Sequence, residues 1–138
     1  MVDGSAIGAV LCVDDDVAGL NLRKEMLEMH GYQVLTAFSA EEALEVFDRE
    51  EIDVVLTDHL LRDQSGTSLA AEMKRRRPDV AVAVYSGVAQ SPEDIHKADA
   101  FITKLVTPEE LIAYLERTIS AKRAGRKTTA KFSKKQGR

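Results

Sequence analysis

The chain alternates short apolar runs with amphipathic stretches, and this alternation constrains its fold more than any other feature. Five apolar runs have the length of buried strands, namely residues 9–13, 32–37, 52–57, 80–85 and 100–103. A stretch with the apolar spacing of a helix follows each of them. Apolar strands joined by helices indicate a parallel sheet covered on both faces, with right-handed crossovers. We therefore predict an α/β fold with a doubly wound, five-stranded parallel sheet flanked by helices.

Capping residues mark where several of these helices should begin or end. Residues 39–42 have the form of a capping box, and residues 107–110 combine a hydroxyl at the N-cap with Pro at the first helical position and Glu at the third. Gly31 suits the position just after the first helix. Residues 91–94 can cap a helix before the fifth strand, but the interval leaves room only for a short one.

Polar residues stand at the ends of four of the five predicted strands. They are Asp14-Asp15-Asp16 after the first strand, Asp58 after the third, Ser86 after the fourth and Lys104 after the fifth. In open parallel sheets the functional crevice lies beyond the carboxyl ends of the strands. We therefore expect these side chains to meet at one edge of the sheet.

The chemistry of this set points to phosphoryl transfer. Converging carboxylates repel one another, and Mg²⁺, which prefers a few carboxylates together with water and phosphate oxygens, relieves the repulsion. Lys104 would add a point charge for an anionic group, and Ser86 a hydroxyl donor. A carboxylate can itself be the nucleophile, which gives an aspartyl phosphate. For the residues 14–16 taken alone, the alternative is a solvated N-cap of the first helix, a role that suits Asp16.

Over residues 8–120 the sequence resembles the receiver domains of bacterial response regulators. The matching residues, in chain order, are the acidic pair Asp14 and Asp15, the phosphoacceptor Asp58, the glycine Gly66, the switch hydroxyl Ser86, the switch aromatic Phe101 and the lysine Lys104. Each motif alone is weak, but their order and spacing together are specific. The resemblance implies a flavodoxin-like fold with strand order 2-1-3-4-5.

The resemblance also implies a mechanism for the site. A histidine kinase or a phosphotransfer protein would donate a phosphoryl group to Asp58. Mg²⁺ would be held by Asp15, Asp58 and the backbone carbonyl of Leu60, and Asp14 would act largely through water.

A two-state switch would follow phosphorylation, which adds roughly −1.5 to −2 charges. Ser86 would move toward the new oxygens and Phe101 would turn inward, so that a downstream protein partner binds differently. Plainer roles stay open for both residues, since Ser86 can satisfy backbone groups and Phe101 can belong to the core.

Three departures from the family pattern bear on the expected output. Arg62 stands where the family usually has Pro, and Leu105 follows Lys104 where the family usually has Pro after a cis bond. A cis bond before a non-proline residue costs about 2.5–4 kcal/mol, so we expect a trans bond here. Only 18 positions separate Ser86 from Lys104, whereas family members typically have a few more. This spacing predicts a shortened fourth helix, and that helix belongs to the usual output face of the family.

Charge divides the chain into two parts. Eight of the 19 basic residues lie after residue 121, where there is no acidic residue, so residues 1–121 carry a net charge of −12. The apolar periodicity also ends there. We therefore expect a receiver domain over residues 1–121 and a basic, disordered tail over residues 122–138.

Composition argues against several other classes. The longest apolar run is far below the roughly 20 residues that span a bilayer, and the N-terminus does not read as a signal peptide, so we expect a cytoplasmic protein with no membrane partner. Cys12 lies in an apolar run and reads as a small buried thiol. The chain has no Trp and few aromatic residues, and no DNA-binding motif follows the fifth β–α unit, which disfavours nucleic acid as a partner.

Three functions compete at this point. The first is a phosphorylatable receiver that is not an enzyme, works with Mg²⁺ and a histidine kinase or phosphotransfer protein, and can form a homodimer. The second is a degenerate receiver that binds proteins without switching. The third is a Mg²⁺-dependent phosphatase with an Asp nucleophile, because Asp14 and Asp16 have the spacing of that class, although the chain has little room for a substrate cap.

Overall fold

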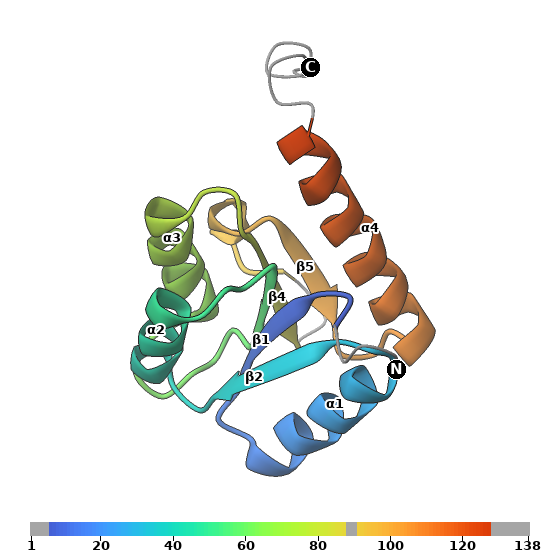
Figure 1. Cartoon of the computed structure of the whole chain (residues 1–138). Helices are drawn as coiled ribbons and strands as arrows, with labels where there is room; N and C mark the ends of the chain where they lie inside the picture. The colour runs from blue at the N-terminus through green and yellow to red at the C-terminus, as the bar shows by residue number, and fades with distance from the viewer. Residues whose placement is uncertain (1–5, 88–90, 128–138) are drawn as a thin grey trace.

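The computed structural model describes residues 6–87 and 91–127, and within them the chain forms one parallel sheet flanked by helices (Figure 1). In chain order the elements are β1 (Ala9–Val13), α1 (Val17–Met29), β2 (Gln33–Ala37), α2 (Ala40–Arg49), β3 (Val54–Thr57), α3 (Gly66–Arg76), β4 (Ala81–Ser86), the 3₁₀ turn η1 (Ile95–Lys97), β5 (Ala100–Thr103) and α4 (Pro108–Lys127). The strand order is β2-β1-β3-β4-β5 with every pair parallel. The predicted doubly wound fold and its strand order are confirmed.

Helices cover both faces of the sheet, and each face has its own apolar cluster. Figure 1 shows α1 and α4 on one face and α2 and α3 on the other. Leu20 of α1 and Leu115 of α4 belong to one apolar cluster, and Phe47 of α2 and Met73 of α3 belong to the other. β1 and β3 are buried along their whole length because they lie inside the sheet and are covered from both sides.

Three of the predicted helix ends are confirmed, whereas Asp94, at the N-cap of η1, makes no side-chain capping hydrogen bond. Ser39 accepts a hydrogen bond from the backbone N–H of Glu42 at the start of α2. Thr107 and Glu110 form a reciprocal capping box at the start of α4, with N···O distances of 2.9 and 3.1 Å. Gly31 follows α1 with φ of +96°, a left-handed backbone conformation that glycine adopts without strain.

The crossover between β4 and β5 carries a shortened helical element, as predicted. In its described part only the single 3₁₀ turn η1 is helical. This turn is held against α3, because the buried hydroxyl of Thr67 donates a hydrogen bond of 2.9 Å to Asp94. Residues 88–90, at the start of the crossover, lie outside the described residues.

The end of the last helix differs from the prediction. α4 continues to Lys127, so residues 122–127, which were assigned to a disordered tail, are helical. The extension is anchored by Lys122, whose ammonium lies 3.3 Å from the carbonyl of Ile52 and 3.3 Å from Asp53. The sequence showed no apolar periodicity beyond Ile119 and could not reveal these polar anchors. The rest of the predicted tail, residues 128–138, lies outside the described residues.

Two further features are the thiol of Cys12 and the hydropathy of the helices. Cys12 is fully buried, and its burial raises the pKa of the thiol to about 12, so it is not a reactive nucleophile at neutral pH. Among the described helices, none has the length and hydropathy needed to cross a membrane.

Candidate functional site

The backbone ladder of the sheet continues one residue past the strands and fixes three of the predicted site residues. The N–H of Asp14 donates to Ala37, that of Asp58 to Val13 and that of Lys104 to Ser86, over 3.1, 2.9 and 2.9 Å. These bonds set Asp14, Asp58 and Lys104 at the same edge of the sheet. The peptide bond after Lys104 is trans, as are all the peptide bonds in the described residues.

Three carboxylates form the centre of the site. Asp14, Asp15 and Asp58 each offer one oxygen, and these oxygens lie within 4.8 Å of one another. The side chains of Asp14, Asp58 and Asp15 are 1%, 15% and 27% exposed, so the cluster is buried at Asp14 and partly open to solvent at Asp15. A few converging carboxylates at such spacing fit a hard divalent cation, and Mg²⁺ is the ion that takes such a partial set.

Lys104 enters the cluster from the end of β5. Its Nζ lies 2.7 Å from Oδ2 of Asp14 and 3.8 Å from Oδ1 of Asp58. The amine therefore reaches the carboxylates although Leu105, and not Pro, follows it. The Lys104 amine is therefore closer to Asp14 than to Asp58.

The environment of Asp14 favours its charged form. Burial alone would raise the pKa of this carboxyl. Hydrogen bonds from the Lys104 amine and the Asp16 backbone N–H, together with the positive charges of Lys104 and Arg23, outweigh burial and lower its pKa. Asp14 is thus an anion held by cations of the protein itself.

The environment of Asp58 has the opposite net effect. Burial raises the pKa of its carboxyl, and the negative charge of Asp14 adds to the rise. The charge of Lys104 and hydrogen bonds from the His59 backbone N–H and the Ser86 hydroxyl act against the rise without cancelling it. The negative charge of Asp58 is therefore less well compensated than that of Asp14.

The loop between β3 and α3 brings the start of a helix against the backbone of Asp58. The N–H of Gly66 donates to the carbonyl of His59 over 2.7 Å, and a Cβ on Gly66 would clash with the backbone carbonyl oxygen of Asp58. Only glycine fits there. Leu60 and Ser65 form a single antiparallel bridge that closes the loop, which leaves the Leu60 side chain 64% exposed.

Two of the residues discussed from the sequence lie outside the acidic cluster. Asp16 is exposed and stands at the N-cap of α1, although its side chain makes no capping hydrogen bond. Phe101 lies in β5 opposite Val84, and it is partly exposed rather than buried in the core. Ser86 is 2% exposed and lies at the end of β4, beside Asp58.

Sequence reasoning assigned no contact with the acidic cluster to two arginines, Arg23, which it did not single out, and Arg62, which it noted only as a departure from the family pattern. Arg23 of α1 lies 3.5 Å from Oδ2 of Asp14, with its side chain only 9% exposed. Arg62 lies 3.7 Å from Asp15 with its side chain 82% exposed. Arg23 could have been suspected from its spacing, since it stands three residues after Leu20 and four before Leu27, on the buried stripe of α1.

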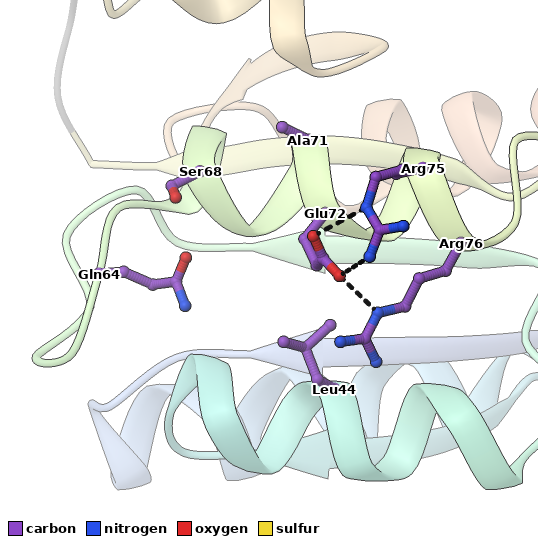
Figure 2. A pocket seen from close by; sticks show the side chains of 7 residues that line it. All are labelled: Leu44, Gln64, Ser68, Ala71, Glu72, Arg75 and Arg76. Carbon is purple, nitrogen blue, oxygen red and sulfur yellow. Dashed lines mark hydrogen bonds and ion pairs between the residues drawn. The ribbon is translucent and has the colours of Figure 1, made fainter.

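A separate hollow lies between α2 and α3, away from these residues (Figure 2). It is lined by Leu44, Gln64, Ser68, Ala71, Glu72, Arg75 and Arg76. Glu72 bridges both arginines, with Nε–O distances of 3.2 Å to Arg75 and 2.7 Å to Arg76 (Figure 2). The two arginines that line the hollow therefore already have a carboxylate partner, and no residue of the acidic cluster lines the hollow.

Known proteins share this fold. The family model of the response regulator receiver domain matches residues 10–116. The chain belongs to that family, whose members act in two-component signal transduction and bind Mg²⁺ at an acidic cluster such as the one formed here by Asp14, Asp15 and Asp58.

The chain is also similar to individual receiver proteins and to solved receiver structures. The transcriptional regulatory protein GlrR of Escherichia coli K12 is 32% identical over 106 residues, which cover 74% of this chain and 24% of GlrR. The chain thus spans about a quarter of the length of that relative. A CheY-like receiver domain protein from Methanospirillum hungatei JF-1 superposes with a TM-score of 0.80 at 31% identity, over 86% of this chain and 98% of that one. TrrA from Thermotoga maritima, solved in complex with Mg²⁺ and BeF, superposes with a TM-score of 0.76 at 27% identity, over 81% of this chain and 99% of TrrA.

Proposed function

We propose that the protein is a phosphoacceptor of a two-component phosphorelay, in which Asp58 takes a phosphoryl group from a histidine kinase or a phosphotransfer protein. The convergence of Asp58 with Asp14, Asp15 and Lys104 carries the proposal. Such a set supplies a nucleophilic oxygen, ligands for a cation and a fixed positive charge, which are what phosphoryl transfer needs.

In the transfer, a carboxylate oxygen of Asp58 attacks the phosphorus of the phosphohistidine. The P–N bond breaks as the P–O bond forms, which leaves histidine on the donor and an acyl phosphate on Asp58. Lys104, with its amine 3.8 Å from Oδ1 of Asp58, is the residue of this chain that offsets charge on the phosphoryl oxygens. The hydroxyl of Ser86 can donate to one of the same oxygens.

For Mg²⁺ we propose Asp15, Asp58 and the backbone carbonyl of Leu60 as ligands, with Asp14 acting through water. Asp14 is suited to an indirect role because both of its oxygens already accept bonds from the protein. When bound, the cation neutralises charge on the transferring phosphoryl group. The TrrA complex with Mg²⁺ and BeF supports such a site in a related domain.

For the response to phosphorylation we propose Ser86 and Phe101 as switch residues. Ser86 is buried beside Asp58, where a phosphoryl group on Asp58 can draw its hydroxyl. Phe101 is partly exposed on β5 and can change between an outward and an inward position. The surface beside β5 would then bind a downstream protein differently.

Intact-mass measurement tests the proposal. After incubation with Mg²⁺ and acetyl phosphate, the wild-type protein should gain the mass of one phosphoryl group, and EDTA should prevent the gain. Asp58→Asn should abolish it, since the variant lacks the nucleophilic oxygen. Asp16→Ala is the matched control and should keep it, because Asp16 is exposed and outside the acidic group. Persistence of the adduct in Asp58→Asn would refute the assignment.

The degenerate receiver is the second candidate, and the single 3₁₀ turn in the β4–β5 crossover favours it, because a shortened output element can uncouple phosphorylation from binding. Its signature is a wild-type protein that takes no phosphoryl group under these conditions, or one whose partner binding does not change when it is phosphorylated. The position of Asp16 outside the cluster argues against the phosphatase, whose signature would be rapid turnover of a phosphomonoester.

A further inference from the structure

Arg23 is a largely buried cation that contacts Asp14 of the acidic cluster. It comes from the inner side of α1, and its guanidinium lies 3.5 Å from Oδ2 of Asp14, with side-chain exposures of 9% and 1%. The guanidinium also lies over the ring of Tyr85, 4.7 Å from its centroid. A cation packed on an aromatic face and out of water is held in place more firmly than a surface charge.

The two oxygens of Asp14 are both occupied. Oδ1 accepts the backbone N–H of Asp16 over 2.9 Å. Oδ2 contacts two cations, Lys104 at 2.7 Å and Arg23 at 3.5 Å. One buried carboxylate oxygen therefore shares two positive charges.

The second cation on Asp14 matters because the proposed function also requires Lys104 at the phosphoryl group of Asp58. Its amine is closer to Asp14 than to Asp58, at 2.7 against 3.8 Å. To serve a phosphoryl group on Asp58 the amine must turn away from Asp14. A carboxylate as buried as Asp14 cannot lose its sole counter-charge without a large penalty, so a lone lysine would be held where it is.

We propose that Arg23 is a positioning residue that stays on Asp14 as its permanent counter-ion and so releases Lys104 for the phosphoryl group on Asp58. The inference rests on the proposed function and assigns a role to a residue outside the acidic cluster. Arg23 acts through Lys104 and does not itself touch the phosphoryl group.

Arg62 provides an internal contrast. It lies 3.7 Å from Asp15, but its side chain is 82% exposed, so water and salt can replace the contact at little cost. Arg62 can leave when a cation approaches Asp15. Arg23 is enclosed by α1, Asp14 and Tyr85, so water cannot replace its contact with Asp14 at a similarly low cost.

The proposal predicts effects of opposite sign on two properties. Without the charge of Arg23, the acidic cluster is more negative, so Mg²⁺ should bind the unphosphorylated protein roughly three- to tenfold more tightly. Lys104 should then be held by Asp14, so phosphorylation at saturating Mg²⁺ should be about tenfold slower or worse. A loss of packing alone would not tighten Mg²⁺ while slowing phosphorylation.

The test compares three variants with the wild-type protein. Arg23→Met removes the charge and keeps the length of the side chain, Arg23→Lys keeps the charge, and Lys24→Gln removes an exposed charge from the next position of α1. Mg²⁺ affinity is measured by NMR titration without phosphodonor, and phosphorylation by intact mass with acetyl phosphate. Thermal unfolding by circular dichroism establishes that each variant is folded.

The expected result is tighter Mg²⁺ and slower phosphorylation in Arg23→Met, partial recovery of both in Arg23→Lys, and wild-type behaviour in Lys24→Gln. A folded Arg23→Met that is phosphorylated at the wild-type rate would overturn the inference. Parallel weakening of both properties in Arg23→Met and Arg23→Lys would also overturn it, since that is the pattern of a structural role. Absence of any adduct on the wild-type protein would instead overturn the proposed function itself.

Discussion

At the scale of single residues, the site combines two carboxylates whose environments have opposite effects. Asp14 is stabilised as an anion by Lys104 and Arg23, whereas Asp58 is buried without full compensation. The raised pKa of Asp58 means that its folded-state carboxyl keeps a proton to higher pH than in the unfolded chain, where the value is about 3.9. Its ionisation therefore destabilises the fold at neutral pH, and this penalty shrinks as the pH falls from the raised pKa toward the unfolded-state value, below which it is lost.

This sign gives a prediction for stability. Asp58→Asn should raise the Tm at pH 7 in buffer without divalent cations, by roughly 2–4 °C for a domain of this size. The difference from wild type should shrink as the pH is lowered toward 4. Asp79→Asn, at an exposed position, is the control and should leave the Tm unchanged. A lower Tm for Asp58→Asn would show that the carboxylate is well compensated after all.

Sequence reasoning found the carboxylates, the hydroxyl and the lysine because each one ends a strand. It missed Arg23 because an arginine within a helix normally reads as solvent-facing. Its burial depends on Asp14 and Tyr85, which come from two other segments of the chain. Its spacing on the buried stripe of α1 hints at burial, but its partners come together only in the folded chain.

At the scale of secondary-structure elements, the site depends on how closely α3 approaches the end of β3. Gly66, the first residue of α3, has no room for a side chain beside the Asp58 carbonyl. This close approach fixes the backbone of Asp58 and the course of the loop that carries Leu60.

Gly66→Ala should therefore be destabilising, by about 1–3 kcal/mol from overpacking against backbone that cannot easily yield. Gly125→Ala is the matched control, because a Cβ there meets no atom within 4 Å and Ala is the better helix former by up to about 1 kcal/mol. Urea unfolding of both variants measures the difference. Equal stability of Gly66→Ala and wild type would mean that the loop adapts, contrary to this description.

The elements themselves were largely predictable. Strands one and five have the predicted bounds, and the other three begin or end one or two residues from the prediction, because frayed strand ends depend on pairing rather than on apolar sequence. The shortened crossover after β4 was predicted from spacing, but its attachment to α3 through Thr67 and Asp94 was not, since that contact joins polar residues far apart in the chain.

At the scale of the whole molecule, the last helix runs past the apolar core and is held there by polar contacts. Lys122 is 11% exposed and pairs with Asp53, whose other oxygen accepts the N–H of Ala9 at the start of β1. The end of α4 is thus tied to the edge of the sheet opposite the acidic cluster. A boundary at residue 121 cuts through this contact.

A chain ending at residue 121 should be less stable than one ending at residue 127, by about 1–2 kcal/mol for the lost charged hydrogen bonds. Lys122→Met in the longer chain should reproduce most of the loss, which separates the contact of Lys122 from helix length. Urea unfolding measures all three. Equal stability of the two truncated chains would support the boundary that the sequence predicted.

The central claim is that Asp58 carries the phosphoryl group, and the most direct measurement locates that group. The protein is phosphorylated with acetyl phosphate and Mg²⁺ and then reduced with borohydride, which converts an aspartyl phosphate into homoserine, and the modified residue is found by peptide sequencing in a mass spectrometer. The account predicts homoserine at position 58 and at no other aspartate. Homoserine at position 14, 15 or 16, with Asp58 unchanged, would contradict it.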